Sequence, residues 1–245
     1  MIPMREPTQA AVGVVLAAGM GARVGADGNK AYLPLAGRSM LAWSVEAVAR
    51  ATTVTRTILV FRRGERALAA ATLAAEVPQL DVELVEGGDT RHGSEENVLH
   101  HLASDIEAGA VDVVLVHDAA RPLATPAMMD TAVTTARARG GAIPVLPAAD
   151  VVAGDADGRL SAAKGTLVRV QTPQAFRARP LLAAYLAAAG GSFDGTDTAS
   201  CVQNYTDVDV HVFPGAATNL KVTFAPDVQL AERLLQDRIS RSGPR

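Results

Sequence analysis

Short apolar runs recur along the chain and alternate with longer segments of helical spacing. Polar, glycine or proline residues bound the runs, which lie at residues 12–16, 57–61, 82–85, 113–116 and 142–146. Runs of this length, rich in valine and leucine, predict buried β-strands. The segments between them are rich in alanine and leucine and predict helices over residues 39–51, 65–76, 94–106 and 125–140. Ser39 and Thr125 are suited to cap two of these helices.

The order of these elements predicts the fold class. Strands that alternate with helices form βαβ units, which build a mainly parallel sheet with helices on both faces. Further helices are predicted at residues 179–190 and 225–240, and late strands at 209–215 and 218–224. We therefore expect residues 1–245 to form a single, Rossmann-like α/β domain with its ligand crevice at the carboxyl ends of the strands.

Residues 148–169 interrupt this rhythm. Their sequence, AADVVAGDADGRLSAAKGTLVR, alternates short polar and apolar residues around the turn GDADG. The pattern predicts a projecting β-hairpin, and an ordinary solvent-exposed loop is the alternative.

Composition and charge exclude several classes of protein. With 49% hydrophobic and 20% charged residues and a mean hydropathy of +0.16, the composition is that of a folded globular protein. A net charge of -3 gives no general attraction to nucleic acid or anionic lipid. No secretory leader and no run of about 18 apolar residues is visible, so we expect a soluble, cytoplasmic protein with no membrane or nucleic-acid partner. Cys201, the single cysteine, excludes an internal disulfide and is expected to be a buried thiol.

The first predicted strand runs into a loop with several glycines and two cations, VVLAAGMGARVGADGNKAYLPLAG at residues 14–37. Glycines let backbone N–H groups approach a phosphate closely, and Arg23 and Lys30 are placed to neutralise a triphosphate. The loop is not a dinucleotide-binding fingerprint, because Val24 stands where G-x-G-x-x-G requires its third glycine. Nor is it a Walker A motif, and a simple tight turn is the alternative.

Two further motifs place polar residues directly after predicted strands. VHDAARP places Asp118 and Arg121 at the carboxyl end of a predicted strand, where a carboxylate can hold hydroxyls or a metal-bound phosphate. GGDTRHGS supplies Gly88, Asp89 and Ser94 after another strand. The alternatives are a capping aspartate with a surface arginine in the first motif, and an acidic turn before a helix N-cap in the second.

Two late segments add further candidates. Lys221, in NLKVT, falls on a predicted strand among apolar neighbours, where its charge is costly without an anionic partner. On an edge strand the same lysine would simply reach water. Thr196 and Asp197 suit a substrate hydroxyl or phosphate, or they merely start the helix DTASCVQ.

These motifs together resemble a known family. The glycine loop is similar to the signature loop of sugar nucleotidyltransferases, which likewise ends in a lysine before a Pro-Leu-like turn. EGGDTRHGS, VLVHDAARP, VQTPQAF, TDTAS and NLKVT follow in the order and spacing of the 2-C-methyl-D-erythritol 4-phosphate cytidylyltransferase family, over nearly the whole chain. The resemblance implies transfer of CMP from CTP to that polyol phosphate in non-mevalonate isoprenoid biosynthesis. It also implies a homodimer, in which the 148–169 hairpin completes the acceptor site of the neighbouring subunit.

The resemblance also implies a role for each matching residue. Arg23, Lys30 and Lys221 would be catalytic, stabilising the charged transition state and holding the acceptor phosphate. The nucleotide would be bound by Ala17, Ala18, Gly19, Gly21, Gly88, Asp89 and Ser94, and the acceptor by Asp118, Arg121, Lys164, Thr196 and Lys221. Mg²⁺ or another divalent cation would be held mainly by the CTP phosphates, with Asp118 nearby.

Some positions depart from the family pattern. Asp150 is followed by Val151, where the family usually has a threonine, and Lys164 stands in place of an arginine. Lysine keeps the charge but loses the bidentate geometry. Ala22 replaces a common second arginine, and Asn29 replaces a proline that often precedes the lysine. The nucleotide half of the site thus matches better than the acceptor half.

These departures leave two alternatives open. One is the same chemistry on another polyol phosphate such as ribitol 5-phosphate. The other is a catalytically silent nucleotide-binding paralogue, against which the retained charges of Arg23, Lys30, Asp118 and Lys221 argue. An NAD-dependent dehydrogenase is disfavoured by the missing third glycine.

Overall fold

The computed structural model describes residues 10–19, 28–154, 157, 159–161, 165–189, 193, 195 and 197–242. Four of the predicted site residues lie outside these ranges, namely Gly21, Arg23, Lys164 and Thr196.

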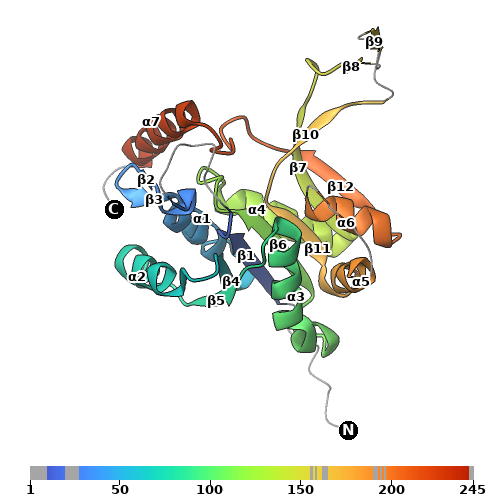
Figure 1. Ribbon diagram of the computed structural model, residues 1–245, viewed down its shortest axis with the longest axis horizontal. Helices are drawn as coiled ribbons and strands as arrows, with labels where there is room; N and C mark the ends of the chain where they lie inside the picture. Colours follow the sequence, from blue (N-terminus) through green and yellow to red (C-terminus); the bar gives the residue numbers. More distant parts are fainter. Residues whose placement is uncertain are drawn as a thin grey trace.

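One large sheet organises the described residues (Figure 1). Its strands follow the order β10-β7-β11-β6-β1-β4-β5, and β12 pairs with β7. Their bounds are β1 Ala11–Leu16, β4 Val54–Phe61, β5 Val82–Glu86, β6 Val113–Asp118, β7 Gly141–Pro147, β10 Val168–Val170, β11 Gln174–Arg177 and β12 Val210–Pro214. The pairs β1–β4, β1–β6, β4–β5 and β7–β12 are parallel, whereas β11 and β10 run antiparallel to their neighbours. The prediction of a mostly parallel α/β sheet is confirmed.

Helices cover both faces of this sheet. Their bounds are α1 Met40–Ala49, α2 Arg66–Glu76, α3 Arg91–Glu107, α4 Pro126–Arg139, α5 Ala178–Ala188, α6 Thr198–Tyr205 and α7 Ala225–Ser242. In β1, Ala11 and Val15 pack with α1, α2 and α4, whereas Val12 and Val14 pack with α3, α5 and α6. Because side chains alternate along a strand, a strand buried on both faces is apolar throughout, which explains the continuous runs in the sequence.

The predicted helix starts are also found. The Ser39 side chain accepts a hydrogen bond from the Ala42 N–H, and Thr125 does the same for the Met128 N–H. These bonds satisfy N–H groups that the first turn of a helix leaves without partners. Cys201 is fully buried, and burial raises the pKa of its thiol to about 11.

One predicted strand is wrong. The segment 218–224 forms no strand and instead crosses the end of the sheet as a loop between β12 and α7. Its Asn219 is fully buried and donates from Nδ2 to the Thr172 carbonyl at 2.9 Å, while Leu220 and Val222 pack in a cluster with α7. The apolar alternation of TNLKVTF therefore reflects packing of a loop, and Lys221 lies on that loop.

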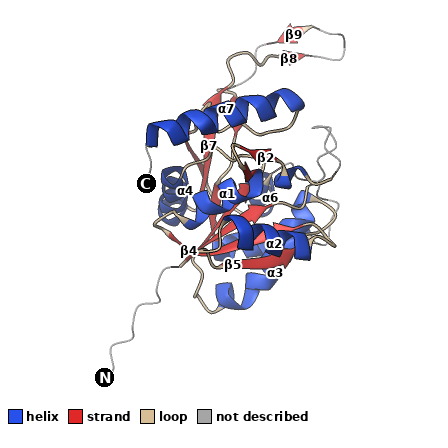
Figure 2. Ribbon diagram, turned by 90° about the vertical axis from the view of Figure 1, so that its left-hand side faces the viewer, coloured by secondary structure: helices blue, strands red, loops and turns tan. Residues whose placement is uncertain are grey.

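The described part of the 148–169 segment, which leaves out residues 155, 156, 158 and 162–164, projects from the body of the molecule (Figures 1 and 2). Its two short strands, β8 Ala153–Gly154 and β9 Leu160–Ser161, pair antiparallel beyond the ends of β7 and β10. The predicted hairpin is thus confirmed.

Three short elements complete the fold near the glycine loop. They are η2 Lys30–Tyr32, β2 Pro34–Leu35 and β3 Arg38–Ser39, of which the last two form a small antiparallel pair. Among the described helices, none combines the length and apolar character that crossing a membrane requires.

Candidate active site

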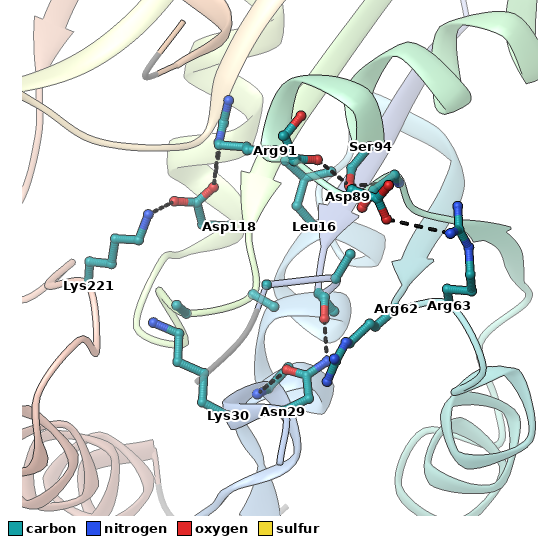
Figure 3. Close-up of a pocket in the computed structure, with 18 residues that line it drawn as sticks. Leu16, Asn29, Lys30, Arg62, Arg63, Asp89, Arg91, Ser94, Asp118 and Lys221 are labelled. Carbon is teal, nitrogen blue, oxygen red and sulfur yellow. Dashed lines mark hydrogen bonds and ion pairs between the residues drawn. The ribbon is translucent and has the colours of Figure 1, made fainter. Parts of the chain in front are cut away.

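A cavity of about 630 Å³ opens at the carboxyl ends of the parallel strands (Figure 3). This is the edge at which open α/β sheets bind their ligands. Its walls come from the segments after β1, β4, β5 and β6, together with the loop before α7, and are formed by Leu16, Ala17, Ala18, Gly19, Asn29, Lys30, Ala31, Arg62, Arg63, Gly88, Asp89, Thr90, Arg91, Ser94, Asp118, Ala119, Ala120 and Lys221.

Asn29 ties the two described ends of the glycine loop together. Its Nδ2 donates to the Ala17 carbonyl at 2.6 Å and to Glu65 Oε2 at 2.8 Å, while its Oδ1 accepts from the Ala31 N–H at 3.0 Å. The side chain is buried, so these bonds are shielded from water. From the sequence Asn29 appeared only as a departure from proline, and its role as a loop clasp was missed.

This clasp places Lys30 at the cavity. Lys30 opens the short helix η2 immediately after Asn29, and its side chain extends along the cavity wall (Figure 3). Its Nζ donates to the Val222 carbonyl at 2.8 Å. The glycine-loop lysine and the loop that carries Lys221 are therefore in direct contact.

Asp118 lies at the end of β6 and contacts two cations at the cavity wall (Figure 3). Its Oδ2 lies 2.7 Å from Nζ of Lys221, and its Oδ1 lies 3.4 Å from Nη2 of Arg91. Burial by itself raises the pKa of this carboxyl, but the charges of Arg91, Lys221 and Arg121 outweigh it and hold the pKa well below its usual range. Asp118 is therefore ionised at neutral pH.

The backbone of Asp118 is fixed by a second motif. The Thr172 hydroxyl, in QTPQ, accepts from the Asp118 N–H at 3.0 Å and lies 3.2 Å from Nδ1 of His117. His117 is fully buried, and burial lowers its pKa to about 4. Because neutral imidazole can accept at Nδ1 and donate from Nε2, it fits between the Thr172 hydroxyl and the Arg121 carbonyl, which lies 3.2 Å from Nε2.

The GGDTRHGS motif forms another wall and begins α3. Gly88 N–H donates to Ser94 Oγ at 3.2 Å, and Ser94 Oγ donates to the Thr90 carbonyl at 2.9 Å. A Cβ on Gly88 would lie 2.7 Å from the backbone carbon of Gly93, so only glycine fits there. Thr90 caps the helix, so the motif is a helix N-cap as well as part of the cavity wall.

Three arginines, one within this motif and two after β4, went unrecognised in the sequence. Arg91 begins α3, and Arg62 and Arg63 follow β4; all three line the cavity. Arg63 Nη1 lies 3.5 Å from Oδ1 of Asp89, a pair largely exposed to solvent. The position of each arginine after a strand or at a helix start was a usable signal, because these are the chain segments that meet at the ligand edge of the sheet.

Arg121 stands apart from the cavity walls. Its Nη1 donates to the Asn219 carbonyl at 2.8 Å, so it braces the loop that carries Lys221.

Of the remaining predicted residues, the structure brings together Ala17, Ala18, Gly19, Lys30, Gly88, Asp89, Ser94, Asp118 and Lys221 around one cavity. Asp197 caps α6 by accepting from the Ser200 N–H at 2.9 Å, which agrees with the prediction that it starts this helix.

The fold and the site together define a class of protein. A cavity at the carboxyl ends of a parallel sheet, next to the described ends of a glycine loop and lined by lysines, arginines and the carboxylates Asp89 and Asp118, is the arrangement of a nucleotide-dependent phosphoryl or nucleotidyl transferase.

Comparisons with known proteins give the family. Residues 11–237 match the model of the family 2-C-methyl-D-erythritol 4-phosphate cytidylyltransferase, and the chain belongs to this family. A protein of that name from Cereibacter sphaeroides is 38% identical over 91% of this chain and 95% of its own length. The protein of the same name from Frankia casuarinae is 40% identical over 96% of this chain and 84% of its own length.

Solved structures agree. The 4-diphosphocytidyl-2C-methyl-D-erythritol synthase of Anaerococcus prevotii superposes with a TM-score of 0.80 at 25% identity, covering 93% of this chain and 96% of its own. The cytidylyltransferase of Thermus thermophilus gives a TM-score of 0.69 at 29% identity, covering 94% and 100%.

Proposed function

We propose that this chain transfers CMP from CTP to 2-C-methyl-D-erythritol 4-phosphate, which gives 4-diphosphocytidyl-2-C-methyl-D-erythritol and pyrophosphate in non-mevalonate isoprenoid biosynthesis. The observation that carries the proposal is the placement of Lys30, Asp118 and Lys221 around one cavity in a chain of this family. The curated relatives support the same acceptor, so ribitol 5-phosphate and a silent paralogue are not favoured.

The chemistry requires positioning and charge neutralisation more than proton transfer. A phosphate monoester is already a nucleophile, so its oxygen can attack the α-phosphorus of CTP in line while pyrophosphate leaves. Lys30, with Arg23 of the same loop, stabilises the negative charge that builds on the phosphorus. Lys221 holds the acceptor phosphate beside the α-phosphate, and its contact with Asp118 fixes where its charge sits.

The nucleotide occupies the part of the cavity between the glycine loop and the start of α3. The backbone of Ala17, Ala18 and Gly19 faces the phosphates, and Gly21 continues the loop. A Cβ on Gly19 would meet no protein atom within 4 Å, so the space beside this residue is open to a ligand. Gly88, Asp89 and Ser94 line the opposite wall, where they bind the cytosine and its ribose. Exposed Asp89 is free of a tight ion pair, because Arg63 approaches it only to 3.5 Å.

The acceptor lies on the Asp118 side. Asp118 and Thr196 hold its hydroxyls, Lys221 holds its phosphate, and Arg121 assists by bracing the Lys221 loop. Lys164, from the hairpin of a second subunit, adds a cation.

A divalent cation fits this site only as a companion of the nucleotide. The described residues contain no cluster of three or more His, Cys, Asp or Glu side chains that would hold a metal ion unaided. Asp118 lies at the cavity wall already paired with Lys221 and Arg91, so Mg²⁺ would take most of its ligands from the phosphates, with Asp118 nearby. When bound, it neutralises phosphate charge and aids departure of pyrophosphate.

The projecting hairpin supports a homodimer. Its apolar side chains are exposed: Leu160 by 76%, Val152 by 57% and Val151 by 44%. Apolar side chains gathered on a projection away from the core are typical of an interface. A second copy covering them would bring the hairpin to the acceptor end of the neighbouring cavity.

Pyrophosphate release tests the proposed reaction. Purified protein is supplied with Mg²⁺ and CTP, and separately with 2-C-methyl-D-erythritol 4-phosphate or ribitol 5-phosphate; ATP replaces CTP in a control. Turnover with CTP and the first acceptor supports the proposal. Turnover only with ribitol 5-phosphate would identify that compound as the acceptor instead. No pyrophosphate release with either acceptor would indicate a nucleotide-binding protein without this activity.

A further inference from the structure

A buried carboxylate lies directly behind the wall of the cavity. Glu95 is on the second turn of α3, and only 3% of its surface is exposed. Its Oε1 accepts from Nη1 of Arg91, one turn earlier, at 2.7 Å. The hydroxyls of Tyr185 on α5 and Thr198 on α6 also donate to this carboxylate. Glu95 therefore joins three helices to one cavity residue.

The surroundings of Glu95 are otherwise fixed and apolar. The ring of Tyr185 stacks on His92, with centroids 4.6 Å apart and planes 12° from parallel. Val98 and Leu99 follow Glu95 in α3 and belong to the buried core. Burial raises the pKa of Glu95, and the charge of Arg91 opposes that rise. A buried ion pair is seldom more stable than apolar residues of similar volume, so stability alone gives no reason for a carboxylate here.

The position of Arg91 gives that reason. Arg91 stands between two carboxylates, 2.7 Å from Glu95 but 3.4 Å from Asp118. A full guanidinium–carboxylate pair closes to about 2.8 Å. Glu95 thus takes the shorter carboxylate contact of Arg91, and Oδ1 of Asp118 keeps two long ones, 3.4 Å from both Nε and Nη2. An oxygen held loosely is still able to accept from a substrate hydroxyl.

We propose that Glu95 is a positioning residue, which restrains Arg91 from a full ion pair with Asp118 and so keeps that carboxylate available to the acceptor. The assignment of Asp118 to the acceptor comes from the proposed function, on which this role of Glu95 rests. Without the charge of Glu95, Arg91 turns to Asp118 and competes with acceptor hydroxyls. Thr198 extends the same cluster to the first residue of α6, directly after the cap Asp197.

Steady-state kinetics of Glu95→Gln test this role. Glutamine has nearly the same shape and keeps hydrogen bonds to the hydroxyls, but it lacks the charge that attracts Arg91. We expect the KM for the acceptor to rise about 10-fold, while the KM for CTP changes by less than about twofold. Glu96→Gln is the matched control, because Glu96 is the next residue of the same helix and is partly exposed. An acceptor KM at the wild-type value in Glu95→Gln, with only a lower melting temperature, would reduce Glu95 to a structural residue.

A double-variant comparison shows whether Glu95 acts through Arg91. If it does, adding Glu95→Gln to Arg91→Met causes no further loss in kcat/KM for the acceptor. A further 10-fold loss in the double variant would overturn the proposal. Should Glu95→Gln fail to fold, Glu95→Asp keeps the charge but withdraws it from Arg91, and an intermediate rise in acceptor KM is expected; no rise would contradict the role.

A measurement that needs no turnover separates this role from the proposed function. The Nε–Hε NMR signal of Arg91 reports how firmly its side chain is held. We expect the Arg91 signal of Glu96→Gln to match that of wild type, where the side chain is held in one position. In Glu95→Gln we expect this signal to be shifted from its wild-type position. Absence of pyrophosphate release in wild type would overturn the proposed function, whereas an unchanged Arg91 signal in Glu95→Gln would overturn the positioning role, whatever the activity.

Discussion

Nζ of Lys221 lies 2.7 Å from Oδ2 of Asp118, although 103 residues separate them in the chain. Asp118 ends a central strand, whereas Lys221 lies on the loop before α7. Arg121 donates to the Asn219 carbonyl on that loop, and the Val222 N–H donates to the Ala120 carbonyl at 2.8 Å, so these contacts hold the loop against the end of the strand. In the proposed function, the contact of Lys221 with Asp118 would place a carboxylate for the acceptor hydroxyls beside a cation for the acceptor phosphate.

Lys221→Met should therefore impair catalysis with respect to the acceptor more than with respect to the nucleotide. Methionine keeps most of the side-chain length but removes the charge, so we expect kcat/KM for the acceptor to fall about 10²-fold or more. Varying each substrate at saturating levels of the other measures this split. Arg233→Met, an exposed cation on α7, is the control and should leave both constants unchanged. A wild-type acceptor KM and kcat in Lys221→Met would remove Lys221 from the site.

Lys30→Ala tests transition-state stabilisation. The lysine points along the cavity wall from the glycine loop, so its loss should lower kcat by about 10² or more. Its hydrogen bond to the Val222 carbonyl is also lost, which should cost about 1 kcal/mol of stability. Kinetics and thermal unfolding of the same sample separate the two effects. An unchanged kcat would show that Lys30 does not act on the reacting phosphate.

His117 makes stability depend on pH. Burial lowers its pKa to about 4 in the folded protein, from an unfolded value of 6.5. Unfolding therefore takes up a proton between these values, so this contribution is fully present above pH 6.5 and is lost as the pH falls towards 4. Between pH 7 and pH 5 we expect a loss of about 2 kcal/mol from this group.

Urea unfolding of His117→Gln at both pH values isolates the effect. The variant should lose less stability on acidification than wild type, and exposed His100→Gln should behave like wild type. Equal losses in wild type and His117→Gln would mean that His117 is not held neutral.

The projecting hairpin predicts that the protein forms a dimer. Wild-type protein should sediment at about twice the mass of the 25.3 kDa chain, because exposed apolar side chains on a projection favour a second copy. Val152→Asp combined with Leu160→Asp should give monomers with a raised acceptor KM. Leu68→Asp, on α2 and 49% exposed, is the control. A monomeric wild-type enzyme with full activity would contradict the role of the hairpin.

The sequence predicted those features that depend on local pattern. Strands buried on both faces are continuously apolar, and Ser39 and Thr125 have the chemistry of helix caps, so both were found. Lys30, Asp118 and Lys221 were found because each belongs to a recognisable motif. The structure agrees with the chain order of nearly all helices and strands.

What the sequence missed depends on contacts between distant segments. Glu95 meets Tyr185 and Thr198, which lie 90 and 103 residues further along the chain. Asn29 acquires its role only because Glu65 and the end of β1 meet at its side chain. Likewise, the pattern of 218–224 resembles a strand, but a buried asparagine and packing against α7 hold that segment as a loop.

A competition assay tests the central claim most directly. The enzyme is given CTP and Mg²⁺ with equal concentrations of 2-C-methyl-D-erythritol 4-phosphate and ribitol 5-phosphate, and the two possible cytidine diphosphate products are separated by mass. The ratio of initial rates equals the ratio of kcat/KM for the two acceptors. We predict that 4-diphosphocytidyl-2-C-methyl-D-erythritol predominates by about 10²-fold or more. Equal amounts of the two products, or an excess of the ribitol product, would contradict the assignment of the acceptor.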